Sequence, residues 1–139
     1  MAERIGGSVP APLRFELGQA PVAGETARAV LLVTVGEDGA PRVAVLSTAE
    51  VQAENDHTLR VVVRAASTTA ANLRRGSKAV LWCVLDAAAY SVCGTCAIAS
   101  VRSGDSEFVA FEMTVRDVYR DFERNAPMIA PPTYRAPPP

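Results

Sequence analysis

Histidine is almost absent from this sequence: His57 is the only one among 139 residues. A single histidine excludes every metal site that needs two or more imidazole ligands, and with it most zinc hydrolases. Phe, Trp and Tyr make up only 6% of the chain, too little for the aromatic platform on which single-stranded nucleic acid stacks. Fourteen basic and fifteen acidic residues leave a net charge of −1, whereas nucleic acid or an anionic membrane attracts a positive excess. We therefore expect no metal, no nucleic acid and no membrane as partners.

Long hydrophobic runs are missing too. The longest, near residues 30–35 and 79–85, have about seven residues, whereas a membrane helix needs about twenty. Residues 1–7 contain no hydrophobic stretch typical of a secretion signal. Three cysteines are few, and an odd number, for a disulfide framework. These absences favour a soluble protein of the cytoplasm.

Motifs of known catalytic machinery are also lacking. The sequence has no Gly-x-Ser-x-Gly nucleophile elbow, no Walker loop and no Gly-x-Gly-x-x-Gly fingerprint. Its acidic residues are scattered, and Glu107, Glu112 and Glu123 are expected to face solvent. His57 lies in a polar segment predicted to be a turn, which favours a solvated side chain. No catalytic residue is identified at this point.

The cysteines raise the question of a redox or metal site. Cys93 and Cys96 form a Cys-x-x-Cys pair, but on a predicted strand residues three apart point to opposite faces of the sheet. If the turn after residue 85 is symmetric about Ala88, Cys83 and Cys93 become neighbours across two strands. We expect inert structural thiols, with a redox switch through Cys93 and Cys96 as the alternative.

Hydrophobic residues make up 49% of the chain and charged residues 21%, which is typical of one globular domain. Short hydrophobic or alternating segments predict six strands, at residues 29–35, 40–51, 59–64, 78–86, 90–103 and 108–119. In the last of these, Val109, Phe111, Met113 and Val115 fall on one face. Trp82 lies within another strand and is assigned to the core or an interface.

Turn and helix signals separate these strands. Gly36 and Gly39 flank an acidic pair and predict a hairpin. Residues 67–76 predict a short helix, with hydroxyls at its start, two arginines in its last turn and glycine at its end. Residues 13–20 fit either a short helix or an edge segment.

Together these elements predict a mainly β fold, a small antiparallel barrel with one or two short helices. We divide the chain into an N-terminal lead-in at residues 1–28, a barrel domain at 29–122 and a Pro-rich tail at 123–139. Because proline has no N–H, the tail is expected not to pair in a sheet.

The junction between strand and helix at residues 64–72 is the best candidate for a binding site. A helix N-terminus offers unpaired N–H groups and the positive end of the helix dipole, which suits a phosphate. Ser67, Thr68 and Thr69 add hydroxyl groups there, and Arg64 and Arg42 are near in the predicted sheet. Simple N-capping of the helix by Ser67 or Thr68 is the alternative.

The order and spacing of these segments, from about residue 29 to 101, resemble the FMN-binding split β-barrel family, the pyridoxamine 5′-phosphate oxidase-like proteins. In that family a strand motif running from arginine to lysine and a Ser-Arg-Lys segment hold the flavin phosphate. Arg42 matches the arginine of the strand motif, and Ser47 stands at its lysine. Ser67 matches the serine of the second motif, with Thr68 and Thr69 at its basic positions. Arg64 and Arg75, which lie outside the matched motif, are the candidates to replace the missing basic groups. A further landmark is Gly94 in the fifth strand.

The resemblance implies a six-stranded split barrel that binds FMN and acts as an oxidoreductase on a small molecule. It also implies a homodimer with the cofactor in a cleft between subunits, to which Trp82 or the Pro-rich tail contributes. The implied cofactor-binding residues are Arg42, Val43, Val45, Ser47, Arg64, Ser67, Thr68, Thr69 and Asn72. Each missing charged hydrogen bond to the phosphate removes about 1.5–3 kcal/mol. The alternative is a non-enzymatic dimeric barrel that has lost the flavin or binds another ligand, such as a deazaflavin or haem.

Overall fold

Strand β8, Phe108–Asp121, shows how the sequence forms a sheet with one buried face. Phe111, Met113 and Val115 are buried, whereas Glu112 and Thr114 between them are exposed. Alternate residues of a strand point to opposite faces, so the pattern gives β8 an inner and an outer face. The face predicted for this strand is confirmed at these three core residues.

The computed structural model describes residues 2–76, 78–99, 107–126, 128, 130 and 132–138. The strands are β1 (Ala2–Gly6), β2 (Thr26–Val35), β3 (Pro41–Ser47), β4 (Val51–Ala53), β5 (Thr58–Arg64), β6 (Lys78–Leu85), β7 (Ala88–Ile98), β8 and β9 (Thr133–Arg135). The helices are α1 (Ala11–Glu16), α2 (Thr68–Gly76) and the 3₁₀ turn η1 (Thr48–Glu50). Residues 100–103 of the predicted fifth strand lie outside the described residues.

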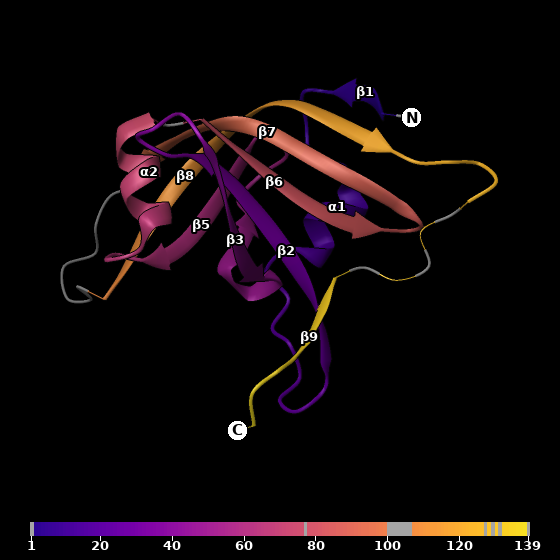
Figure 1. Cartoon of the computed structure of the whole chain (residues 1–139). Helices are drawn as coiled ribbons and strands as arrows, with labels where there is room; N and C mark the ends of the chain where they lie inside the picture. Colours follow the sequence, from indigo (N-terminus) through magenta and orange to yellow (C-terminus); the bar gives the residue numbers. More distant parts are fainter. Residues whose placement is uncertain are drawn as a thin grey trace.

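The strands form one antiparallel sheet in the order β3-β2-β6-β7-β8-β5-β4, with β1 added to β8 and β9 added to β2 (Figure 1). Its two end strands, β3 and β4, are consecutive in the chain and joined by η1. The inner faces share a single core, to which β2 gives Leu32, β5 Val61, β6 Leu81 and β8 Phe111. The predicted mainly β, antiparallel class with one or two short helices is therefore confirmed, and the described residues contain two, α1 and α2.

The strand count differs from the prediction, because the described residues form nine strands rather than six. The three additional strands are β1, β4 and β9, of which β4 and β9 have only three residues each. Segments this short carry no periodicity that a sequence pattern can reveal. They become strands because longer neighbours offer them a free edge.

Both ends of the chain pack against the barrel. The expectation that the Pro-rich tail cannot pair is wrong, since Tyr134 pairs with Ala27 of β2 and Ala136 donates a hydrogen bond to the Glu25 carbonyl. The pairing residues Thr133–Arg135 contain no proline, so their N–H groups remain available. At the other end α1, a helix rather than an edge segment, buries Leu13 in the core. The division into lead-in, domain and tail remains a prediction.

The β6–β7 hairpin turns through two residues, Asp86 and Ala87, which both have positive φ, +50° and +65°. This tight turn pairs Leu85 with Ala88, and so places Tyr90 opposite Cys83. Cys93 lies opposite Val80. The predicted pairing of Cys83 with Cys93 is wrong, because the hairpin is centred between residues 86 and 87 and not at Ala88.

The cysteines are free. Cys96 is buried in the core whereas Cys93 is half-buried on the outer face, which agrees with the opposite orientations predicted for the pair. Burial raises the pKa of the Cys83 thiol to about 12 and that of Cys96 to about 11. Thiols with a raised pKa are poor nucleophiles, which supports a structural role.

Changing Ala87 to glycine is expected to stabilise the protein by about 1 kcal/mol, because alanine at a φ of +65° carries a steric cost that glycine lacks. The Asp-Gly pair is also favoured in two-residue hairpin turns. Urea denaturation of Ala87→Gly beside the parent measures the effect. An unchanged or lower free energy of unfolding would contradict it.

Candidate functional site

A hollow of about 430 Å³, which we call the α2 hollow, lies where the β2–β3 turn meets the beginning of α2. The turn and the start of β3 contribute one wall, and one face of α2 with the residue pair before it contributes the other. The lining residues are Gly36, Glu37, Asp38, Arg42, Ala66, Ser67, Thr68, Ala71, Asn72 and Arg75. Segments more than twenty residues apart in the chain therefore meet at one polar cavity.

Helix α2 begins at this hollow because Ser67 caps it. The Ser67 Oγ accepts a hydrogen bond from the Ala70 N–H at 3.0 Å and donates one to the Arg64 carbonyl at 2.7 Å. The N–H groups of Thr68 and Thr69, the first two helical residues, have no acceptor within the helix. The capping function predicted for Ser67 is confirmed, and free N–H groups remain beside it for an anion.

Arg42 stands at the start of β3 with its guanidinium 3.0 Å from a carboxylate oxygen of Asp38. The Asp38 carboxylate also accepts the Ala40 N–H. The Ala40 hydrogen bond first, and then Arg42, lower the pKa of Asp38. Asp38 is therefore ionised at neutral pH and offsets part of the positive charge of Arg42.

Asn72 connects the helix to the sheet beneath it. Its side chain, in a residue only 4% exposed, donates a hydrogen bond to the buried Thr34 hydroxyl at 3.0 Å and accepts one from Arg75 at 3.2 Å. The Arg75 guanidinium also donates to the Val35 carbonyl. Asn72 thus fixes α2 on β2 and holds Arg75 at the hollow.

Four of the nine residues that the sequence nominated line this hollow: Arg42, Ser67, Thr68 and Asn72. Thr69 is half-buried beside it and is not part of the lining. Arg64 points elsewhere, since its guanidinium pairs with Glu107 at 2.8 Å and lies over the Phe108 ring at 5.3 Å.

The remaining nominated residues follow β3 away from the hollow. Val43 and Val45 are 62% and 66% exposed. The Ser47 side chain caps η1 by accepting the Glu50 N–H. At this end of β3 lies a second hollow of about 410 Å³, lined by Pro21, Val45, Leu46, Ser47, Ala49, Glu50, Tyr134 and Pro137.

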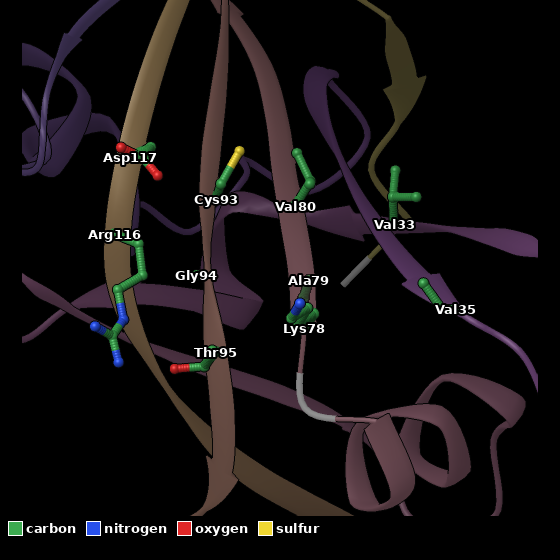
Figure 2. Close-up of a pocket in the computed structure, with 10 residues that line it drawn as sticks. All are labelled: Val33, Val35, Lys78, Ala79, Val80, Cys93, Gly94, Thr95, Arg116 and Asp117. Carbon is green, nitrogen blue, oxygen red and sulfur yellow. The ribbon is translucent and has the colours of Figure 1, made fainter. Parts of the chain in front are cut away.

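A third hollow, of about 330 Å³, lies on the outer face of the sheet across β2, β6, β7 and β8 (Figure 2). Its lining is mostly apolar and includes Val33, Val35 and Val80. The polar lining residues include Lys78, Arg116 and Asp117. Trp82 is half-buried and pairs with Leu31 and Ser91 on neighbouring strands. None of the nine cofactor-binding residues nominated from the sequence lies in this hollow, although Cys93 and the landmark Gly94 do.

From the sequence, Arg75 was considered only beside Arg64, as a substitute for the missing basic groups outside the matched motif, and the turn residues Glu37 and Asp38 were not nominated. A signal for Arg75 exists: positions 67, 71 and 75 recur every four residues and share one helix face. The turn residues give no comparable signal. The tertiary fold decides which side of a hairpin turn contacts a distant helix.

Other predicted features lie away from these hollows. The His57 side chain is 63% exposed and lies 3.4 Å from Asp56, which agrees with a solvated turn. In the described residues, no three His, Cys, Asp or Glu side chains gather closely enough to hold a metal ion. The described helices include none with the length and hydrophobicity to cross a membrane.

Comparison with solved structures identifies proteins that share this fold. HupZ from Group A Streptococcus superposes with a TM-score of 0.63 at 12% identity, over 81% of this chain and 98% of that chain. A conserved hypothetical protein from Mycobacterium tuberculosis gives 0.61 at 15% identity, over 92% and 96%. An F420 reductase gives 0.58 at 13% identity, over 79% and 98%. These identities show a shared fold alone.

Sequence comparison gives the family. No curated protein sequence matches this chain. The family model described as Pyridoxamine 5′-phosphate oxidase matches residues 22–131, which is most of the chain. That span includes every strand from β2 to β8 and the whole α2 hollow. The chain therefore belongs to the pyridoxamine 5′-phosphate oxidase family.

Proposed function

We propose that this protein binds FMN, with the phosphate in the α2 hollow, and acts as an oxidoreductase on a small molecule. The observation that carries the proposal is the meeting of Arg42, Arg75 and the beginning of α2 at one hollow in a chain of this family. When bound there, FMN would supply the electron-transfer chemistry, and the protein would orient it and the substrate.

The donors around the hollow fit a phosphate group. Arg42 and Arg75 bring guanidinium groups, Thr68 brings a hydroxyl, and the first N–H groups of α2 point outward from the helix end. Glu37 and Asp38 line the same hollow and oppose this positive charge. Because Asp38 is exposed, Arg42 can exchange it for a phosphate at small cost. The donor set therefore suits an anion, held less tightly than in family members with more basic residues.

Strand β3 offers a track for the rest of the cofactor. In the described residues it pairs only with β2, so the N–H and C=O groups on its other edge are free. From Arg42 to Ser47 this edge runs about 17 Å, at the usual rise per strand residue. We assign the flavin ring to the edge between Val43 and Ser47, as the family resemblance implies.

The proposal includes a homodimer with the cofactor cleft between its subunits. Two hydrophobic side chains of β3, Val43 and Val45, are solvent-exposed next to the strand edge assigned to the flavin ring. Exposed apolar side chains at such a place are suited to contact with a second subunit. We also assign the protein to the cytoplasm, which agrees with its free cysteines.

A second candidate function is a barrel that takes another ligand in the same hollow. Thr68 and Thr69 stand at the two basic positions of the family motif, and Glu37 and Asp38 add negative charge. These residues weaken the hold on a phosphate monoester, which favours a ligand that is bound mainly by contacts outside this hollow. One solved structure of this fold is an F420 reductase, so a deazaflavin is the alternative to test beside FMN.

Arg75→Ala is expected to weaken FMN binding about tenfold, because it removes one charged hydrogen-bond donor at a partly exposed site. Arg74→Ala is the matched control, since Arg74 lies next to Arg75 on α2 but donates to the Ala65 carbonyl outside the hollow. Flavin fluorescence titrations of the parent and both variants measure the dissociation constants.

Riboflavin, which lacks the phosphate, serves as the second control and should bind the parent and Arg75→Ala equally. Sedimentation of the FMN-bound parent should give a dimer with one FMN per chain. No FMN binding to the parent, or equal losses in Arg74→Ala and Arg75→Ala, would exclude the proposed site.

A further inference from the structure

The β2–β3 turn holds the Asp38 carboxylate in a defined place. The Gly36 N–H donates to the Ala40 carbonyl at 2.8 Å, and the Gly39 N–H donates to the Gly36 carbonyl at 2.9 Å. Within this closed turn one Asp38 oxygen accepts the Ala40 N–H at 3.0 Å. A Cβ built at Gly36 would come within 2.9 Å of that oxygen, so the glycine leaves room for the carboxylate. The turn therefore positions Asp38 at the wall of the α2 hollow.

The two guanidinium groups of the hollow have partners of different charge. Arg42 lies 3.0 Å from the other oxygen of Asp38 and also donates to the Pro41 carbonyl at 3.2 Å. Arg75 donates to two uncharged oxygen atoms, one in the Asn72 side chain and one in the backbone. Arg42 is thus the arginine that an anion of the chain itself already holds.

A carboxylate and a phosphate make the same demand on a guanidinium group, since both accept charged hydrogen bonds from its N–H groups. Asp38 and Arg42 are both exposed, and exposed ion pairs are weak, so a phosphate can displace the carboxylate. The Ala40 hydrogen bond, and then Arg42, lower the pKa of Asp38, which keeps the carboxylate charged at neutral pH. Because it lies four residues from Arg42 in the same chain, it is always at hand.

We propose that Asp38 competes with the ligand phosphate for Arg42 and thereby lowers the affinity of the α2 hollow for FMN. This inference rests on the proposed function, because it concerns the phosphate site assigned there. Asp38 contacts Arg42 and acts through it, so it is a positioning residue. It holds the guanidinium at the hollow when no ligand is bound and releases it to the phosphate. FMN is consequently an exchangeable ligand of this protein.

The test is the affinity of Asp38→Asn for FMN, measured by flavin fluorescence. Asparagine keeps an oxygen for the Ala40 N–H and removes the charge that attracts Arg42. The variant should bind FMN about fivefold more tightly than the parent. Riboflavin, which has no phosphate, should bind both proteins equally. If Asp38 only stabilised the turn, the substitution would weaken the binding of both ligands.

Glu37→Gln is the matched control. Glu37 lines the same hollow and carries the same charge, but the ion pair of Arg42 is with Asp38. The control should change FMN affinity by less than about twofold. In an Arg42→Ala background, adding Asp38→Asn should also change it by less than about twofold, because the competition has lost its target. Thermal unfolding of each variant checks that it is folded.

Inorganic phosphate tests the competition without the flavin. Its binding is followed in NMR spectra by the amide resonances of Thr68 and Thr69, at the beginning of α2. Phosphate should bind Asp38→Asn about fivefold more tightly than the parent. If this gain is found although FMN does not bind the parent, the proposed function fails and the competition by Asp38 stands.

The remaining outcomes each decide the inference. Equal or weaker FMN binding by Asp38→Asn overturns it and leaves the proposed function intact. An equal gain in Glu37→Gln, or an undiminished gain in the Arg42→Ala background, overturns it too, since overall charge would then explain the effect. If neither FMN nor phosphate binds the parent or Asp38→Asn, the inference and the proposed function both fail.

Discussion

Replacing Gly94 with alanine is expected to lower the free energy of unfolding by about 3 kcal/mol, the upper part of the range for overpacked cores. A Cβ built at Gly94 overlaps the carbonyl oxygen of Thr114 and comes within 3.1 Å of the Met113 Cε. The methionine tip can move aside, but the carbonyl belongs to β8, which is paired with β7 on one side and β5 on the other. The backbone therefore cannot yield without breaking the ladder.

Gly76→Ala is the matched control for this prediction. Gly76 ends α2, and a Cβ there meets no atom within 4 Å. Urea denaturation of the parent and both variants gives the free energies of unfolding, and Gly76→Ala should differ from the parent by less than about 0.5 kcal/mol. A loss below about 1 kcal/mol in Gly94→Ala would show that the bulge at residues 93 and 94 adapts to a side chain.

The same glycine shows what could be predicted from the sequence. Gly94 was recognised as a family landmark, but its contact with Thr114 depends on the alignment of β7 with β8. The strands themselves were predictable wherever hydrophobic residues alternate, as in β8. The register of the β6–β7 hairpin was not, because a turn at Asp86-Ala87 and a turn centred on Ala88 both fit the same residues. Only the positive φ angles of Asp86 and Ala87 distinguish them.

The candidate site was predictable to a similar extent. The start of α2 at Ser67 could be predicted from local sequence, because the capping hydroxyl and the helix that it caps are adjacent in the chain. Arg64 precedes Ser67 closely in the chain and was therefore predicted to lie at the phosphate site. Its side chain instead pairs with Glu107, more than forty residues later. Arg75 is held at the hollow by hydrogen bonds to the Asn72 side chain and the Val35 carbonyl. Such choices between partners depend on the folded sheet.

Asn72→Leu is expected to destabilise the protein by about 2 kcal/mol, because it removes a hydrogen bond between two buried side chains. Asn72 and Thr34 are 4% and 1% exposed, so the Thr34 hydroxyl would be left without this partner and without water. Arg75 would lose its hydrogen bond to the Asn72 side chain and keep the one to the Val35 carbonyl. The variant should therefore weaken FMN binding by less than Arg75→Ala does.

A double-mutant cycle with Thr34→Val separates the hydrogen bond from other effects of the leucine. Thr34→Val alone leaves the buried Asn72 amide without an acceptor and should cost about 1–2 kcal/mol. The double variant replaces both polar groups with apolar ones, so its loss should be smaller than the sum of the single losses by about 1 kcal/mol. Urea denaturation of the four proteins measures this coupling. Strict additivity would mean that Asn72 contributes through Arg75 or through packing, and that its bond to Thr34 does not fix α2 on the sheet.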